Sequence, residues 1–258
     1  MSRLHLTFEC QQYTLAGTLD TAPGKTGLLI VSGGNEIRSG AFSGQADIAA
    51  RIASAGFPVF RFDRRGIGDS DGENRGFRRS AKDISAALDA FRAINPQMDR
   101  VVGFGNCDAA SALMLAGGAE CDGLILSNPW TIEQDDGTPP PAALRARYLA
   151  KLKNPKEIMR LLRGGVNFRK LFGGLKQATG GASEYSALAQ EMQKAISKYN
   201  GFACRILLAK NDRTAQAFVS NWLIDESSTY FCEGASHAYV EQHAQKWLEA
   251  QILEVLRS

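Results

Sequence analysis

The sequence predicts an α/β fold, in which helices cover both faces of a mostly parallel sheet. Short apolar runs of the kind found in strands buried on both faces alternate along the chain with stretches of helical periodicity. Glycine and polar residues follow most of these runs, as expected where parallel strands end. The length of 258 residues and a hydrophobic content of 44% suit one large globular domain.

The expected strands and helices follow from their periodicity. Alternating residues over Leu4–Cys10 and Tyr13–Leu19 predict an N-terminal hairpin, and the continuous apolar run Thr26–Val31 predicts a buried strand. The further expected strands cover Pro58–Phe62, the run from Arg100 to Gly105, Gly123–Leu126, Cys204–Ala209 and Thr229–Cys232. The expected helices cover Ala46–Ala55, Ser80–Ile94, a stretch after Cys107, Thr214–Leu223 and Val240–Leu256.

The pattern changes between Thr131 and about Asn200, where helical stretches are broken by pairs of glycines. We therefore assign residues 1–130 and 202–258 to the core and residues 131–201 to a helical insertion. Residues 138–176 carry ten basic side chains and one acidic one, although the net charge of the whole chain is only +3. The rest of the chain is consequently acidic.

Composition excludes several classes of protein. No run of 18 or more apolar residues occurs, so no transmembrane segment is expected, and the N-terminus lacks the apolar region of a signal peptide. The five cysteines form no C-x-x-C pair and only three histidines occur, which argues against a zinc site and favours reduced thiols in the cytoplasm. We expect no metal, no cofactor and no nucleic-acid partner.

Cys107 lies at the most informative turn of the sequence. The apolar run before it breaks at Gly105, and a helix-compatible run of small residues begins just after it. A strand, a sharp turn and a helix with the nucleophile at the apex form a nucleophile elbow, where small residues such as Gly105 and Ala109 let the backbones approach closely. A thiolate at this apex is a strong nucleophile. The alternative is a buried structural cysteine at the end of a strand.

Two further residues follow later strands and complete a candidate triad. Nucleophile, acid and histidine occur in the order Cys107, Asp212, His237. In this interpretation His237 accepts the thiol proton and returns it to the leaving group, and Asp212 orients the imidazole. The alternatives are that Asp212 only caps the helix that begins near Thr214, and that His237 is structural.

Backbone donors for an oxyanion are expected on both sides of the sulfur. The candidates are the N–H of Asp108, which follows the nucleophile, and that of Gly34 or Asn35 in the glycine turn. We expect the Asp108 side chain to point away from the chemistry. Asp63 is interpreted as a turn and packing residue, and Arg38 as a contact for a substrate or partner.

Five motifs carry a resemblance to a known family. They are the glycine turn at 32–35, Asp-Arg-Arg-Gly-Ile-Gly-Asp-Ser at 63–70, the elbow, Asn-Asp-Arg-Thr at 211–214 and Ala-Ser-His at 235–237. Over nearly its whole length the chain resembles α/β-hydrolases of the serine-aminopeptidase and monoacylglycerol-lipase-like group. Ser-Gly-Gly-Asn-Glu-Ile-Arg-Ser-Gly at 32–40 and the cysteine elbow resemble hydrolase 1 of the exosortase A-associated system, a group found with exopolysaccharide gene clusters. Ser32 replaces the usual histidine and Cys107 the usual serine.

The resemblance implies an α/β-hydrolase fold in which the insertion forms a lid over the nucleophile. The basic residues of the insertion then lie on a solvated exterior, or they dock an anionic partner through residues such as Arg160 and Arg163. The carrier arm of an acyl carrier protein, coenzyme A and a membrane surface are candidate partners.

Three functions remain open from the sequence. The first is a hydrolase that cleaves a small-molecule acyl ester or thioester through an acyl-cysteine intermediate. The second is an acyltransferase that passes the acyl group from a coenzyme A or carrier-protein thioester to an alcohol or amine. The third is a binding protein of the same fold without catalysis.

Overall fold

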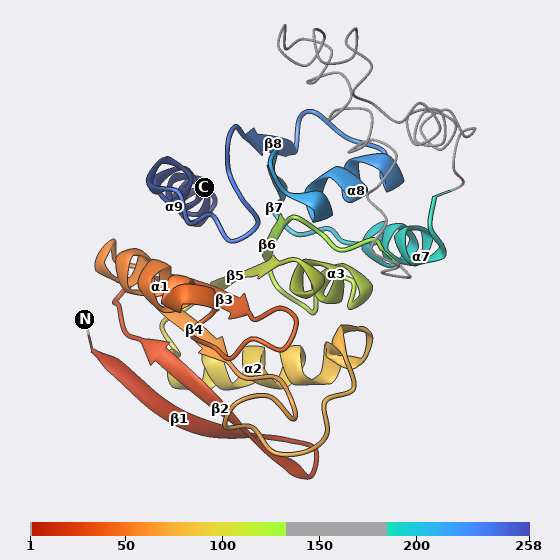
Figure 1. The fold of residues 1–258 in the computed structure, drawn as a ribbon. Coiled ribbons are helices and arrows are strands. Elements are labelled where there is room, and N and C mark those ends of the chain that lie inside the picture. Colours follow the sequence, from red (N-terminus) through yellow and green to blue (C-terminus); the bar gives the residue numbers. More distant parts are fainter. Residues whose placement is uncertain (1, 133–184) are drawn as a thin grey trace, which may run out of the picture.

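The computed structural model describes residues 2–132 and 185–258. The basic segment, including Arg160 and Arg163, and most of the predicted insertion therefore lie outside the described residues. In the described ranges, eight strands form one sheet in the order β1-β2-β4-β3-β5-β6-β7-β8 (Figure 1).

The sheet is mostly parallel, as the sequence predicts. Strands β1 and β2 form an antiparallel hairpin, and β2 also pairs antiparallel with β4. All other neighbouring strands in the described sheet run parallel. The bounds are Arg3–Cys10 (β1), Tyr13–Asp20 (β2), Thr26–Val31 (β3), Val59–Phe62 (β4), Arg100–Asn106 (β5), Gly123–Ser127 (β6), Ala203–Ala209 (β7) and Thr229–Cys232 (β8).

Helices cover both faces of the sheet because successive side chains of a strand point to opposite faces. In β3, Leu29 and Val31 pack into the core under α2, α3, α7 and α8, whereas Leu28 and Ile30 pack under α1 and α9 (Figure 1). The helix bounds are Gly44–Ser54 (α1), Ala81–Ile94 (α2), Asp108–Leu115 (α3), Ala187–Ile196 (α7), Arg213–Asn221 (α8) and Gln242–Arg257 (α9), with short 3₁₀ turns at Ala41–Ser43 (η1) and Phe77–Arg79 (η2). No helix in the described ranges is long and apolar enough to cross a membrane.

Helix α7 belongs to the segment that the sequence assigned to the insertion, yet it packs with the core. It contacts α3, and its residues Leu188 and Met192 are fully buried in the same cluster as the α3 side chains. The apolar face of α7 alone predicts an amphipathic helix, and only the tertiary structure reveals what covers that face. The helical layer of the core therefore includes residues 187–196.

The strand register brings several loops to one edge of the sheet. Asn106 pairs with Ser127, Ser127 pairs with Leu207, and Ala209 pairs with Cys232, so β5 to β8 end at nearly the same level. Because the strands are parallel, the residues that directly follow them meet at this edge. These loops carry Cys107, Asp212 and His237.

Candidate active site

Cys107 lies on a sharp turn between β5 and α3. Its backbone has φ 62° and ψ −129°, a strained conformation for a residue with a side chain. The turn is tight, since α3 begins at the residue after Cys107. The backbones of β5 and α3 therefore approach so closely that a Cβ at Gly105 would lie 2.7 Å from backbone atoms of Ala109 and Ala110. The Cys107 N–H donates to Ser127 O at 3.0 Å, whereas its side chain does not cap α3. The half-exposed thiol is thus presented at the edge of the sheet.

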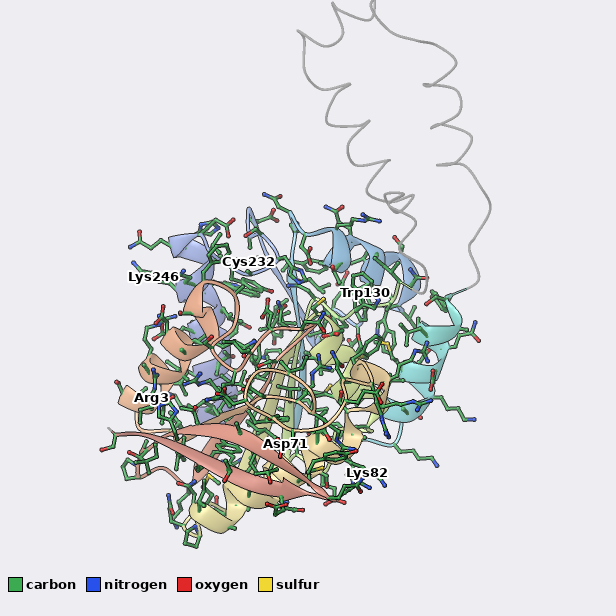
Figure 2. The ribbon with its side chains drawn as sticks, turned by 60° about the horizontal axis from the view of Figure 1, so that its bottom comes forward. Arg3, Asp71, Lys82, Trp130, Cys232 and Lys246 are labelled. Carbon is green, nitrogen blue, oxygen red and sulfur yellow. The ribbon has the colours of Figure 1, made fainter. Side chains whose placement is uncertain are left out.

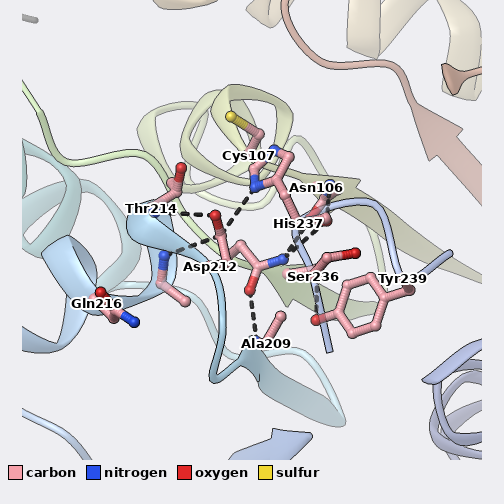
Figure 3. A network of polar contacts seen from close by, with 12 residues as sticks. Asn106, Cys107, Ala209, Asp212, Thr214, Gln216, Ser236, His237 and Tyr239 are labelled. Atoms are coloured by element: carbon pink, nitrogen blue, oxygen red, sulfur yellow. Dashed lines mark hydrogen bonds and ion pairs between the residues drawn. The ribbon is translucent and has the colours of Figure 1, made fainter. Parts of the chain in front are cut away.

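Asp212 contacts both a helix end and the imidazole of His237 (Figure 3). It caps α8 by accepting hydrogen bonds from Thr214 N and Ala215 N, each at 3.1 Å. Its buried carboxylate also lies 2.9 Å, through Oδ2, from Nδ1 of His237. The cap and the histidine contact, which are alternatives in the sequence, therefore coexist in the structure.

His237 lies between the Asp212 carboxylate and the Cys107 side chain. The pKa of the imidazole is raised to about 10, mainly by the hydrogen bond with Asp212 and to a smaller extent by the one with Cys107. Burial opposes this shift. Since Nδ1 faces Asp212, Nε2 is the nitrogen available to the sulfur. The imidazole side chain is 40% exposed. The structure thus brings Cys107, His237 and Asp212 together at one edge of the sheet.

Two asparagines hold the loop that carries His237. Asn106 donates through Nδ2 to the carbonyl oxygen of His237 at 3.2 Å, and Asn128 donates to Asn106 Oδ1 at 2.9 Å. Asn128 also accepts the N–H of Ala209 at 2.8 Å. The sequence analysis assigned neither asparagine a role. The available signal was that each lies at or directly after a strand end at the edge where the site forms.

Tyr239 belongs to the same loop and attaches it to its neighbours. Its hydroxyl shares a hydrogen bond of 2.9 Å with Ser127 Oγ, and its ring stacks on Trp247 of α9. Burial raises the pKa of Tyr239, so the hydroxyl stays neutral. The loop after β8 is thereby attached to both β6 and α9.

The direction of the Asp108 side chain differs from the expectation that it points away from the chemistry. Its Oδ1 accepts the Gly34 N–H at 2.5 Å, and its Oδ2 lies 3.7 Å from Nη2 of Arg64. Arg64 also donates to the carbonyl oxygen of Gly34. The carboxylate turns back because the glycine turn offers a backbone donor and Arg64 a positive charge. One of the predicted oxyanion donors, Gly34 N–H, is therefore occupied by a side chain of the protein itself.

The second candidate donor, Asn35, lies in the same exposed turn. Its side-chain Oδ1 accepts a hydrogen bond of 2.8 Å from Asn74 Nδ2. This contact ties the glycine turn to the loop that follows β4.

Arg38, which the sequence analysis interprets as a contact for a substrate or partner, makes several contacts within the protein. Its guanidinium pairs with Asp63 and with Asp69, and its Nε donates to Thr18 Oγ1 at 3.0 Å. The side chain is only 17% exposed. Asp63 is fully buried and also accepts the Arg38 and Asp69 N–H groups, consistent with its interpretation as a turn and packing residue.

A cavity of about 110 Å³ adjoins the site beside His237. Phe104 and Asn106 of β5 line one side, and Phe42 and Ile48 line another. Its lining is partly apolar, as expected of a small-molecule site.

The described residues contain no group of three or more histidine, cysteine or acidic side chains placed to hold a metal ion. The cysteines at 10, 107, 121, 204 and 232 are all free thiols.

The comparison with protein families identifies the class of protein. The model described as "Alpha/beta hydrolase family" matches residues 28–250. The chain therefore belongs to the α/β hydrolase family, and its strand order and helical layers are those of the α/β-hydrolase fold. A comparison with curated protein sequences gives no match.

Solved structures share the fold at low sequence identity. The α/β hydrolase GrgF from Penicillium sp. sh18 is 19% identical with a TM-score of 0.66, covering 100% of this chain and 98% of that one. The esterase Pf2001 from Pyrococcus furiosus is 13% identical with a TM-score of 0.60, covering 99% and 90%. The thioesterase domain from the curacin biosynthetic pathway is 13% identical with a TM-score of 0.57, covering 98% and 100%.

Proposed function

We propose that the protein is an acyl hydrolase that cleaves a small-molecule ester or thioester through an acyl-cysteine intermediate. The observation that carries the proposal is the contact between Cys107 and an imidazole that is itself paired with a buried carboxylate, Asp212. The α/β hydrolase family and the esterase and thioesterase among its structural neighbours support this class of reaction.

The first half of the reaction forms the acyl-enzyme. The Cys107 sulfur attacks the carbonyl carbon, and the electron pair of the C=O bond moves to oxygen. His237 holds the proton taken from the thiol, and a cationic imidazole beside the sulfur stabilises the thiolate. When the tetrahedral intermediate collapses, the bond to the leaving group breaks and His237 gives the proton to the departing oxygen or sulfur.

The second half returns the enzyme to its starting state. Water attacks the acyl-cysteine carbonyl while His237 accepts one of its protons. Collapse breaks the C–S bond and releases the carboxylic acid, and the sulfur again faces the protonated imidazole. Asp212 accepts the hydrogen bond from Nδ1 of the imidazole in both halves of the reaction.

The oxyanion of both tetrahedral intermediates needs backbone donors. The Asp108 N–H, at the start of α3, lies directly after the nucleophile, and Gly34 N–H lies on the facing turn. Because the Asp108 carboxylate occupies Gly34 N–H in the free protein, the substrate oxygen replaces that carboxylate or uses the N–H of Asn35. Each donor contributes about 3–4 kcal/mol to lowering the barrier in related chemistry.

The finer assignments stay predictions. An acyltransferase would use the same acyl-cysteine but pass it to an alcohol or amine, and a non-catalytic protein would form no acyl-cysteine. Membership of the exosortase A-associated group rests on the glycine turn and the cysteine elbow quoted above.

Burst kinetics with p-nitrophenyl acetate test the proposal. We expect one equivalent of nitrophenol per chain in a fast phase, with a single acetyl adduct on Cys107 in the intact mass. Cys107→Ala removes both signals, whereas Cys204→Ala, at another half-exposed cysteine, keeps them. A burst of equal size in Cys107→Ala would contradict the proposal.

A second experiment separates hydrolysis from transfer. The acetylated protein is mixed with water alone or with a primary alcohol or amine. Acetate as the product in all mixtures indicates a hydrolase, and a new ester or amide in proportion to the acceptor indicates a transferase.

A further inference from the structure

A second cavity lies beside the glycine turn and is separate from the one next to His237. It has a volume of about 260 Å³ and is formed by the loop after β4, by η2 and by the first residues of α2. Lys82 in its lining lies near the tip of the β1–β2 hairpin, where its carbonyl oxygen contacts the Cys10 thiol (Figure 2). Five of the described lining residues are basic: Arg64, Arg65, Arg75, Arg79 and Lys82.

The two acidic residues of the lining do not neutralise this charge. Asp83 is bound to Arg65, with 2.8 Å between Oδ1 and Nη2, and Glu73 lies 4.0 Å from Arg75. Arg79 and Lys82 make no ion pair with any residue that the structure describes. The cavity therefore carries an excess of positive charge.

The start of α2 adds backbone donors to this cavity. Its N-cap residue, Ser80, makes no side-chain cap, because its Oγ accepts from Arg64 at 3.1 Å and contacts Gly76 O at 3.3 Å. Ser80, Ala81 and Lys82 all line the cavity. The first turn of a helix presents unpaired N–H groups and the positive end of the helix dipole, which favour an anion.

One of the basic side chains that line the cavity is buried. Arg65 lines the cavity and is only 9% exposed, yet its Nε has no hydrogen-bond partner among the described residues. Its Nη2 is bound to Asp83 and Gln11, so Arg65 contributes a fixed positive charge to the wall of the cavity.

We propose that this cavity binds a phosphoryl group. Several guanidinium groups and the N-terminus of α2 surround one space, and a phosphoryl group offers several oxygens that can accept from more than one of these donors at once. Arg79 and Lys82 supply exposed charges that no described acidic side chain pairs, and Arg65 supplies a fixed positive charge within the wall.

The position of the cavity connects it to the reaction proposed above, and this step rests on that proposed function. Arg64 lines the cavity and donates to the carbonyl oxygen of Gly34, and Asn74, also in the lining, donates to Asn35. The cavity thus adjoins the predicted oxyanion turn. The substrate class that fits is an acyl compound whose leaving group carries a phosphoryl group, such as a phosphorylated thiol.

Binding of inorganic pyrophosphate to the full-length Cys107→Ala protein tests the site without turnover. We expect saturable binding in calorimetry that weakens about tenfold in the Arg79→Gln/Lys82→Gln variant, because two charge-assisted contacts are lost. Arg78→Gln is the matched control: Arg78 lies on the same turn but pairs with Glu191 of α7 and does not line the cavity. Inorganic phosphate and coenzyme A, titrated in parallel, distinguish a simple anion from a phosphorylated thiol.

The outcomes separate the two proposals. Equal pyrophosphate affinity in all variants would place the anion elsewhere, for example on the basic segment 138–176, and would overturn the inference even if p-nitrophenyl acetate still acylates Cys107. In the protein with Cys107 intact, the inference expects a higher KM for acetyl-coenzyme A in Arg79→Gln/Lys82→Gln than in Arg78→Gln. If Arg79→Gln/Lys82→Gln loses pyrophosphate binding but the native protein is never acylated, the proposed function is contradicted and the anion site stands.

Discussion

At the scale of single residues, the environment of each cysteine sets its reactivity. Cys107 lies beside the imidazole of His237, whereas burial raises the pKa of Cys121 to about 12 and that of Cys204 to about 11. Burial likewise raises the pKa of Cys10 and Cys232. We expect iodoacetamide to alkylate Cys107 first, as peptide mass spectrometry over time would reveal. Uniform slow labelling of all five thiols would contradict an activated nucleophile.

The two contacts of Asp212 can be separated by substitution. Asparagine is as good a helix cap as aspartate but favours the wrong imidazole tautomer, so Asp212→Asn should keep the fold and lower the acylation rate by up to about 10⁴-fold. Asp212→Ala should in addition lose about 1 kcal/mol of stability, because Thr214 N and Ala215 N lose their acceptor. Acylation kinetics and urea denaturation of both variants measure the two effects. Unchanged kinetics in Asp212→Asn would assign the acid to another residue.

Asp108 accepts the Gly34 N–H that the proposed mechanism assigns to the oxyanion. A neutral amide binds that N–H more weakly than a carboxylate does, so Asp108→Asn should acylate several-fold faster than the native protein. Stopped-flow burst rates on a neutral ester check this. A slower burst would instead mean that the carboxylate holds the glycine turn in its reactive position.

The raised pKa of His237 links stability to pH. The imidazole titrates near 6.5 in the unfolded chain and near 10 in the folded one, so the folded state binds its proton more tightly. The resulting stabilisation is fully present below pH 6.5, declines as the pH rises and is lost above about pH 10. Urea unfolding between about pH 6 and pH 10 should therefore show the native protein losing stability relative to His237→Gln. A difference independent of pH would contradict the shift.

At the scale of elements, Asn128 joins β6, β7 and the loop after β8. Its side chain accepts Ala209 N and donates to Asn106, which in turn holds the His237 carbonyl. Asn128→Ala should cost about 1–3 kcal/mol, because Ala209 N–H is left buried without a partner. It should also lower kcat more than it raises KM, since the displaced residue is the proposed base. Denaturation and steady-state kinetics, with Ser227→Ala in an exposed turn as control, measure both.

The elements themselves follow from local sequence, and their partners do not. The sequence predicts Thr26–Val31 and Thr229–Cys232 with the bounds that the structure has, because apolar runs and turn residues are local signals. The direction of the Asp108 side chain depends on Arg64 and on a turn far away in the chain, so no local pattern contains it. The packing of α7 on α3 and the engagement of Arg38 by Asp63 are tertiary in the same way.

At the scale of the whole molecule, the parallel sheet makes the site predictable. Once β5, β7 and β8 are expected to be parallel neighbours or near neighbours, their following loops must meet at one edge, and the candidate residues are the polar ones in those loops. The same argument could have predicted that Asn106 and Asn128 lie near the site, since Asn106 ends β5 and Asn128 directly follows β6. The basic cavity does not follow from the strand order, because the loop after β4, η2, the first turn of α2 and Gln11 of the β1–β2 turn form it together.

The position of β8 at the edge of the sheet has a consequence for protein synthesis. A ribosome delivers the elbow with Cys107 long before it delivers His237, which follows the final strand to be added. Throughout that interval the nascent chain holds a thiol with no imidazole beside it. If the proposed mechanism holds, Cys107 is therefore activated only after β8 and the loop that carries His237 have docked on the sheet.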